Sequence, residues 1–573
     1  MPQSLRQHPT GRARRRRALA FAIVLTALSI GWWQRAYLRG YSETSSSDLD
    51  AVLAAHPEPQ AIGMLRFMYD ALGGLNTDAL QTHATPWKVM STALVLAAAQ
   101  RDGRIIKELS LDDLNAILQE FGFIVPEAIA NWDGDVEPLP FRRPLGIHSG
   151  LLTRSLPRLE LEVTNLGCPA CHAGVTYRPD GTPTRTVWLG LPNTSINLDA
   201  FTIAAYQGLK LAVRTPARLM AGIRHLYPNA TPRELQTIEG TILPLIEERI
   251  GELERTIDAP APYSNGSPGL TNGVGGLKWA LGMLEGDARD VEVGFTSIPE
   301  LGGTLLRTSL LYDGVYAVPG KPRFAPMDSG LVSEQHLRDL AGIVSFFTVP
   351  IMGVTPAIAE RSIPNITDIM RFVASYRSPP FPGAIDSGLA SQGRAVYQVQ
   401  CASCHGSYSP GLTDVRLIRF PNRHVPQGDM GTDSARWQPD SALFPVLMAT
   451  EFADHIDMAS TYGYVATPLT GLWATAPYLH NGSIPTLWHL MHPEGRPERF
   501  YVGGHRLDFS RVGIDGVADS AGVYRYPTGY QPWSRPHLYD TRRPGLRNTG
   551  HDREFAPLTE AQKAALLEYL KLL

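Results

Sequence analysis

The stretches CPACH at Cys168–His172 and CASCH at Cys401–His405 contain all four cysteines of the 573-residue chain. In each stretch two thiols stand three positions apart, and a histidine follows directly. Two thiols at this spacing can bond to one haem, and the next histidine then reaches the iron as its proximal ligand. The sequence therefore predicts two covalently bound haem c groups, held by Cys168, Cys171, His172, Cys401, Cys404 and His405.

Two other interpretations of the cysteines fit less well. Four thiolates suit a structural zinc site, but the cysteine pairs of such sites usually lie some tens of residues apart. Here more than two hundred residues separate the pairs. A disulfide within one Cys-x-x-Cys pair would be a redox motif, which does not require the histidine that follows both pairs.

The N-terminus combines a basic run with an apolar one. Residues 1–17 contain Arg12 and Arg14–Arg17, and an apolar run follows at Ala18–Trp33. This pattern is typical of a secretion signal or a signal anchor. No small-residue cleavage site follows, so we expect an uncleaved inner-membrane anchor at 18–33, with a cytoplasmic tail and a periplasmic body. Cleavage of the signal is the alternative, and it would make the protein a secreted one.

Composition and periodicity indicate a globular body made mainly of helices. Hydrophobic residues make up 43% of the chain and charged residues 19%, as in soluble globular proteins. The formal net charge of -3 gives no reason to expect nucleic-acid binding. Apolar residues return every three or four positions in segments such as Ala61–Tyr69, which predicts an N-terminal helical extension at 44–139. We expect a mainly α fold with two c-type cytochrome domains and long loops.

The two haem domains are predicted at 140–378 and 385–573. A Pro-rich segment at 377–383 separates them, because helices do not continue through such a sequence. Helices are predicted at Asn365–Tyr376, at Leu389–Val399 before Cys401, and after the capping-box pattern Thr559–Gln562.

A faint internal repeat supports a duplicated domain. Leu306–Gly314 and Trp473–Gly482 can be aligned on their final glycines. The alignment pairs Leu311 with Leu479, Tyr312 with His480, and Asp313 with Asn481.

The segment APYLHNGSIPTL at 476–487 resembles the bacterial dihaem cytochrome c peroxidase superfamily. Other segments are more similar to the rubber oxygenase branch of this superfamily: PLTGLWATAP at 468–477, Arg496-Pro497, FYVG at 500–503 and NTGH at 548–551. The resemblance extends from about residue 140 to the C-terminus and is strongest around 385–555. It implies a haem oxidoreductase in which the two irons have different roles.

The resemblance also suggests a sixth ligand for the second iron. Many members place a methionine within the Pro-Tyr-x-His-x-Gly segment, where this chain has Leu479, which cannot bind iron. In the rubber oxygenase branch a histidine of an Asn-x-Gly-His motif fills this role, and the matching residue is His551. A surface position for His551 is the alternative, in which case Met430, Met448 or Met458 would substitute.

The first iron is the better candidate for reaction with a substrate. Leu311 stands at its corresponding repeat position, so the iron has no evident sixth ligand and can bind oxygen or peroxide. His172 is then the proximal ligand of the reactive iron, and Tyr312 is a candidate catalytic residue. The pair Phe346-Phe347 could line the same pocket, although such aromatic residues are more often part of a core. His148 could instead close the site.

Other features of the superfamily have weaker counterparts here. Some members transfer electrons through a tryptophan between the haems, and Trp279 and Trp473 are candidates, with core packing as the alternative. Calcium is a possible cofactor, but no acidic cluster has the spacing of a calcium loop, so calcium stays unassigned.

The expected function is that of a periplasmic dihaem c-type oxidoreductase. Peroxidase- or oxygenase-type chemistry would act on peroxide, oxygen or an apolar organic substrate at the first haem. A small redox partner protein or a quinol-linked donor would supply electrons through the second. The alternatives are an electron-transfer cytochrome without a substrate pocket and a structural or sensing protein with vestigial haems.

Overall fold

The computed structural model describes residues 52–56, 58–69, 85–132, 143–155, 158–351, 356–436 and 443–573. The predicted anchor at 18–33 and tail at 1–17 lie outside the described residues. Within the described ranges, no helix combines the length and the apolar character needed to cross a membrane.

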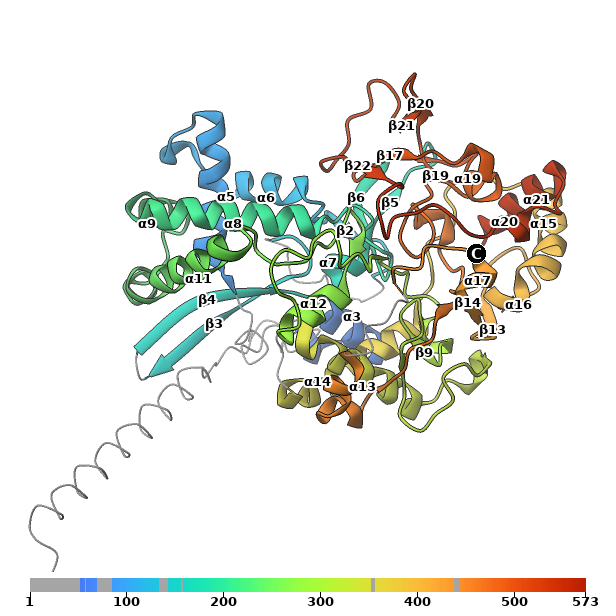
Figure 1. The fold of residues 1–573 in the computed structure, drawn as a ribbon, viewed down its shortest axis with the longest axis horizontal. Coiled ribbons are helices and arrows are strands. Elements are labelled where there is room, and N and C mark those ends of the chain that lie inside the picture. The colour runs from blue at the N-terminus through green and yellow to red at the C-terminus, as the bar shows by residue number, and fades with distance from the viewer. Residues whose placement is uncertain are drawn as a thin grey trace, which may run out of the picture.

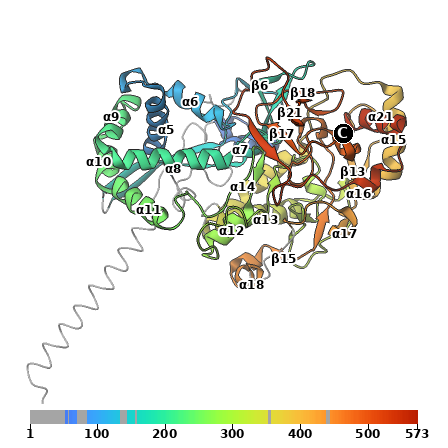
Figure 2. The ribbon, with the colours of Figure 1, turned by 45° about the horizontal axis from the view of Figure 1, so that its top comes forward.

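One end of the molecule is a helical subdomain with its own hydrophobic core (Figure 1). Its elements are α5 (Trp87–Asp102), η1 (Ile106–Glu108), α6 (Leu111–Glu120), α8 (Leu198–Arg214), α9 (Pro216–Leu226), α10 (Pro232–Thr237), the π-helical turn η2 (Ile238–Ile242) and α11 (Leu243–Thr256). Helix α6 begins after Ser110, whose side chain accepts a hydrogen bond from the backbone N–H of Asp113. Such N-caps satisfy donors that a helix leaves free at its first turn. Helix α8 runs from this end toward α7 (Figure 2).

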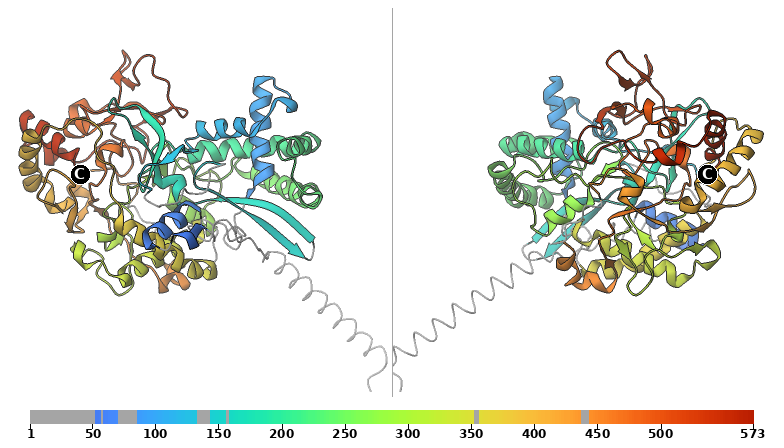
Figure 3. Two further views of the ribbon diagram at one scale, coloured as in Figure 1. Left: turned by 180° about the vertical axis from the view of Figure 1, so that it is seen from behind. Right: turned by 45° about the vertical axis from the view of Figure 1, so that its right-hand side comes forward.

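A second, larger core contains the elements around both cysteine motifs. Those associated with the first motif are α3 (Pro59–Tyr69), α7 (Cys168–His172), α12 (Gly273–Ala280), η3 (Thr304–Leu306), η4 (Ser329–Leu331), α13 (Glu334–Ile351) and α14 (Pro356–Ser375). Helix α3 packs against α14, as the view from behind shows (Figure 3). Helices α3 and α5 both fall inside the predicted extension at 44–139, yet they belong to different cores.

The second motif lies among short helices at the opposite end. These are α15 (Ser387–Gln400), α16 (Ala402–His405), α17 (Gln427–Met430), α18 (Leu443–Met448), η5 (Glu451–Asp454), η6 (Leu472–Ala474), α19 (Leu487–Met491), η7 (Pro493–Gly495), α20 (Asp552–Phe555) and α21 (Glu560–Leu570). The predicted helix before Cys401 is confirmed as α15. The predicted capping box is confirmed as well, because Thr559 and Gln562 exchange side chain to backbone hydrogen bonds at the start of α21.

Each motif region contains a pair of crossing helices with a glycine at the contact. Helix α15 crosses α21, and α3 crosses α14. A glycine lies at each crossing: a Cβ on Gly393 would collide with the carbonyl of Ala565, and a Cβ on Gly63 with the carbonyl of Asp368. Both crossings therefore depend on glycine for close backbone approach.

Short strands form eight small sheets among the described residues. The strands are β1 (Thr85–Pro86), β2 (Ala128–Ile129), β3 (Ile147–Ser155), β4 (Arg158–Leu166), β5 (Ala173–Tyr177), β6 (Pro183–Leu189), β7 (Leu270–Thr271), β8 (Thr296–Ser297), β9 (Ser309–Leu310), β10 (Tyr316–Ala317), β11 (Met327–Asp328), β12 (Ser407–Tyr408), β13 (Leu417–Phe420), β14 (His424–Pro426), β15 (Asp457–Met458), β16 (Gly463–Val465), β17 (Arg499–Val502), β18 (Leu507–Asp508), β19 (Gly513–Ile514), β20 (Val517–Ala518), β21 (Val523–Arg525) and β22 (His537–Asp540). Two sheets mix strands from the two regions: β15 pairs with β10, and β11 pairs with β13.

The prediction of a mainly α fold is wrong. Of the described residues, 44% are helical and 16% lie in strands, a mixed α and β composition. The longest hairpin, β3–β4, was detectable, because Leu161 and Val163 alternate with polar residues and are buried. Most other strands have two to four residues, too few for a recognisable alternation, and only their partners from distant segments stabilise them.

Candidate functional site

The first motif forms one helical turn, α7, which brings both thiols and the histidine into a short helix of five residues. Burial raises the pKa of the Cys168 thiol to about 11 and that of Cys171 to about 12. The Nδ1 atom of His172 lies 3.1 Å from the carbonyl oxygen of Pro299. A carbonyl only accepts hydrogen bonds, so Nδ1 carries the proton and Nε2 keeps its lone pair for a metal.

The second motif repeats this arrangement. Cys401 ends α15, and Cys404 and His405 lie in α16. The Nδ1 atom of His405 donates to the carbonyl oxygen of Thr467 at 2.8 Å. Both motif histidines are therefore held in the tautomer whose Nε2 can bind iron, as proximal histidines require.

The predicted repeat is confirmed, and it extends further than the sequence indicated. Segments 297–314 and 465–482 can be aligned position by position, because equivalent features recur at the same spacing. The equivalent pairs are the histidine-accepting carbonyls of Pro299 and Thr467, the left-handed residues Gly303 and Gly471, Leu311 (φ 67°) and Leu479 (φ 70°), and Gly314 and Gly482. Left-handed leucines are rare, so their recurrence shows that the two segments have the same backbone fold.

The two repeat segments also bond to each other. The backbone N–H of Ser297 donates to the carbonyl of His480 at 2.6 Å, and that of Val465 donates to the carbonyl of Tyr312 at 2.8 Å. The rings of Tyr312 and His480 meet edge to face with centres 6.3 Å apart. Tyr312 further shares a hydrogen bond with the Ser297 hydroxyl at 2.8 Å. Tyr312 thus lies where the two motif regions meet.

His551 is brought to the second motif from the far end of the chain. Its ring centre lies 6.3 Å from that of His405, and the ring planes differ by 27°. Two imidazoles that bind one metal from opposite sides, with bonds of about 2 Å, have ring centres about 6 Å apart. The pair therefore fits an iron between the two rings.

The environment of His551 favours its neutral form. Burial and the nearby His405 and Arg496 lower the pKa of His551 to about 3. A histidine must be neutral to bind a metal. Among the described residues, the buried Nδ1 of His551 has no hydrogen-bond partner, and such an atom often indicates a group that the chain does not itself supply.

The methionine alternatives are placed differently. Met458 lies in β15 opposite Tyr316 of β10, Met448 ends α18, and Met430 ends α17. The ring contact with His405 is made by His551 instead.

The candidates near the first motif lie on different elements. His148 packs against Gly167, but its Nε2 donates to the carbonyl of Met68 at 2.9 Å. That nitrogen is protonated and cannot also bind iron. Phe347 packs against Tyr316 with ring centres 5.6 Å apart, and Phe346 stacks on His455 at 4.1 Å.

The two tryptophan candidates are not equivalent. Trp473 is buried at the junction of the two regions, where its Nε1 donates to the carbonyl of Pro379 at 3.0 Å. Its ring centre lies 6.3 Å from that of Tyr177 and 5.6 Å from that of Phe381. Trp279 is only half-buried and packs on Tyr263 at 6.0 Å.

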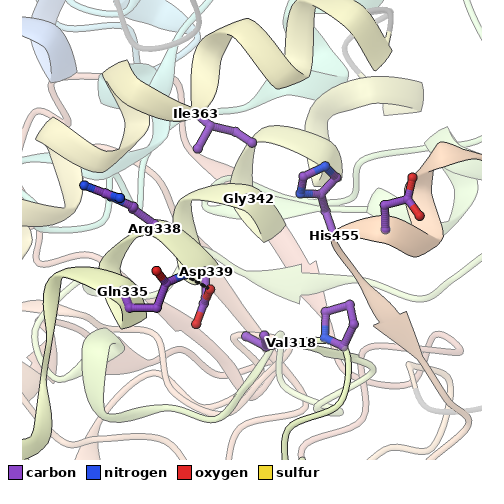
Figure 4. A pocket seen from close by; sticks show the side chains of 9 residues that line it. Val318, Gln335, Arg338, Asp339, Gly342, Ile363 and His455 are labelled. Atoms are coloured by element: carbon purple, nitrogen blue, oxygen red, sulfur yellow. Dashed lines mark hydrogen bonds between the residues drawn. The ribbon is translucent and has the colours of Figure 1, made fainter.

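A pocket of about 360 Å³ lies beside α13 and shares no lining residue with either motif (Figure 4). Charged and polar side chains dominate its wall, including Gln335, Arg338, Asp339 and His455. His455 forms an ion pair with Glu360 at 2.9 Å when it is protonated.

No group of three or more His, Cys, Asp or Glu side chains within the described ranges is arranged to hold a metal ion. Calcium therefore stays unassigned. The fold does add residues that the sequence did not single out, namely Pro299 and Thr467, whose carbonyls accept hydrogen bonds from the motif histidines. Backbone carbonyls have no sequence signature, so only the fold could reveal them.

Comparison with known proteins agrees with these features. Residues 463–501 match the family described as RoxA-like, cytochrome c-like. The matched segment includes Thr467, Leu479 and Arg496, but His551 lies beyond it. The match indicates a haem-binding protein with electron-transfer or oxidoreductase function.

Two proteins of Sinorhizobium fredii are similar over part of the chain. Uncharacterized protein y4iM is 34% identical over 264 residues, which cover 41% of this chain and 59% of that protein. Uncharacterized protein y4iJ is 29% identical over 262 residues, which cover 34% of this chain and 41% of that protein. The chain thus spans about half the length of these relatives.

Proposed function

We propose that this protein is a dihaem c-type oxidoreductase of the periplasm whose two irons have different tasks. The first, bound at Cys168, Cys171 and His172, would react with peroxide or oxygen. The second, bound at Cys401, Cys404 and His405, would relay electrons. The observation that carries the proposal is the asymmetry between the two histidines: the ring of His551 faces His405, whereas among the described residues no ring faces His172 in this way.

Haem bound at these residues would supply one-electron redox chemistry, and an iron with an open position could bind oxygen or peroxide. The chain's own residues would make the first iron reactive and the second iron an electron relay. The Pro299 and Thr467 carbonyls accept hydrogen bonds from Nδ1–H of His172 and His405. These bonds orient each ring and make its Nε2 a more basic ligand for a metal. His551 would occupy the remaining position beside His405 and exclude small ligands there.

The junction of the repeat segments suggests how the two sites communicate. Trp473 is buried and packs against Tyr177, which follows the first motif in β5, and the Tyr312 and His480 rings of the two repeat segments meet edge to face. We propose Trp473 as the residue for electron transfer between the haems. Tyr312 stays our candidate catalytic residue, although its hydroxyl is already bonded to Ser297.

Carbon monoxide binding to the reduced protein tests the proposal. We expect one carbon monoxide per chain in the wild type and two in His551→Ala, with loss of one low-spin signal. His492→Ala is the matched control, because His492 is a buried histidine that bonds to Glu560 and faces no motif. Binding of no carbon monoxide by the wild type would instead support an electron-transfer cytochrome without a substrate pocket.

The substrate requires a separate comparison. Peroxide turnover with a reduced small redox protein or a quinol-linked donor would identify a peroxidase. Oxygen uptake with an unsaturated hydrocarbon would identify an oxygenase. Retention of the segment at 18–33 in the membrane fraction would support an anchored periplasmic enzyme, and release of a shortened chain would indicate secretion.

A further inference from the structure

Arg496 is a buried arginine that joins α19 to the loop carrying His551. Only 5% of its side chain is exposed. Its guanidinium donates to two carbonyls at the end of α19, those of His489 at 3.1 Å and Leu490 at 2.9 Å. It also donates to two carbonyls of the 548–552 loop, those of Asn548 at 2.9 Å and Gly550 at 3.0 Å.

The contacts of Arg496 surround His551 on both sides along the chain. Gly550 precedes His551, and Asp552, which follows it, forms an ion pair with the Arg496 guanidinium at 2.8 Å. The side chain of Asn548 donates to the carbonyl of Pro497 at 3.2 Å, which adds a second link to the same segment. The loop is therefore held through backbone carbonyls just before the histidine and through the Asp552 carboxylate just after it.

The backbone of this loop needs such support. His551 has φ 65°, in a region that residues with a side chain adopt uncommonly, whereas the neighbouring φ of 113° at Gly550 is open to glycine. A strained conformation persists only where surrounding contacts determine it. Without the bonds to Arg496, the loop would relax toward more common angles, and the direction of the His551 side chain depends on those angles.

We propose that Arg496 is a positioning residue that keeps His551 opposite His405, so that the second iron stays closed to added ligands. The inference rests on the proposed role of His551 as the sixth ligand. Arg496 touches no reacting atom and acts through the loop. Its planar guanidinium can reach four carbonyls and a carboxylate at once, which the three donors of a lysine ammonium cannot match.

The experiment compares Arg496→Lys and Arg496→Gln with the wild type and with His551→Ala, all as haem-loaded full-length protein. Carbon monoxide bound per chain and the low-spin fraction of the second haem are the readouts, with thermal unfolding recorded in parallel. Arg323→Lys is the matched control: Arg323 also bonds to backbone carbonyls, of Gly314 and Val315, and to Asp457, but it does not contact the His551 loop.

We expect carbon monoxide binding to rise from one per chain toward two in Arg496→Gln, and to an intermediate value in Arg496→Lys. Free imidazole should restore the low-spin signal in both variants, because it supplies the ligand that the displaced loop no longer provides. The first haem and the Arg323→Lys control should keep wild-type spectra.

The outcomes separate the two ideas. If His551→Ala leaves carbon monoxide binding at one per chain, the ligand assignment fails, and this inference fails with it. If His551→Ala opens the iron but both Arg496 variants stay closed, the ligand assignment stands and the role of Arg496 is refuted. Should Arg496→Gln not fold, Arg496→Lys and Asn548→Ala, which weakens the same loop, decide the question by the same readout.

Discussion

Replacement of Gly393 by alanine tests the helix crossing that supports the second motif. Gly393 lies in α15 where the carbonyl of Ala565 in α21 makes its closest approach, and a Cβ there would collide with that backbone atom. Alanine improves helix propensity by roughly 1 kcal/mol. Forcing a methyl group into a packed site costs up to about 3 kcal/mol, and a backbone atom cannot rotate away. We therefore expect a net loss of about 2 kcal/mol in the free energy of unfolding.

The same change should affect the haem site, because α15 ends at Cys401. A shift of α15 away from α21 would tilt His405 relative to His551 and reduce the low-spin fraction. Denaturant unfolding followed by the low-spin signal of the second haem measures both effects in one titration.

Gly240→Ala is the matched control. Gly240 is an exposed helical glycine, and a Cβ there would meet no atom within 4 Å. Alanine at such a site should stabilise the protein by roughly 0.4–1 kcal/mol. A Gly393→Ala midpoint equal to or above that of the wild type would refute the argument that this crossing requires glycine.

Two further changes test the junction and the first motif region. Trp473→Phe removes the hydrogen bond to the Pro379 carbonyl and should slow electron transfer between the haems at least tenfold, as measured by stopped-flow reduction. The control Trp279→Phe should leave this rate unchanged. Equal rates in the two variants would exclude Trp473 from the electron-transfer path. Burial lowers the pKa of His148 from 6.5 to about 4, so the native state binds fewer protons than the unfolded state between these values. Its contribution, about 3 kcal/mol at most, is present above about pH 6.5 and is lost as the pH falls toward 4. His148→Gln should therefore flatten the fall in unfolding free energy between pH 7.5 and 4.5, and an unchanged slope would show that other groups cause it.

The sequence alone determined the features that depend on short spacing. The CPACH and CASCH motifs act within a single helical turn, so adjacency in the chain is enough to predict haem attachment. Short spacing was also enough to predict helix α15, the capping box at Thr559 and the repeat that pairs Leu311 with Leu479. His551 was accessible through a local motif and its resemblance to a family, although spacing could not show which iron it approaches.

Only the tertiary structure decided which distant groups meet. The ring of His551 lies beside that of His405, and Arg496 bonds to the carbonyls of Asn548 and Gly550 just before His551. Trp473 lies at the junction and Trp279 does not, although both looked alike in the sequence. The prediction of a mainly α fold failed for the same reason, since two-residue strands exist only through their partners. Backbone carbonyls and packing contacts leave no pattern in the chain, so the orientation of each iron ligand depends on the folded structure.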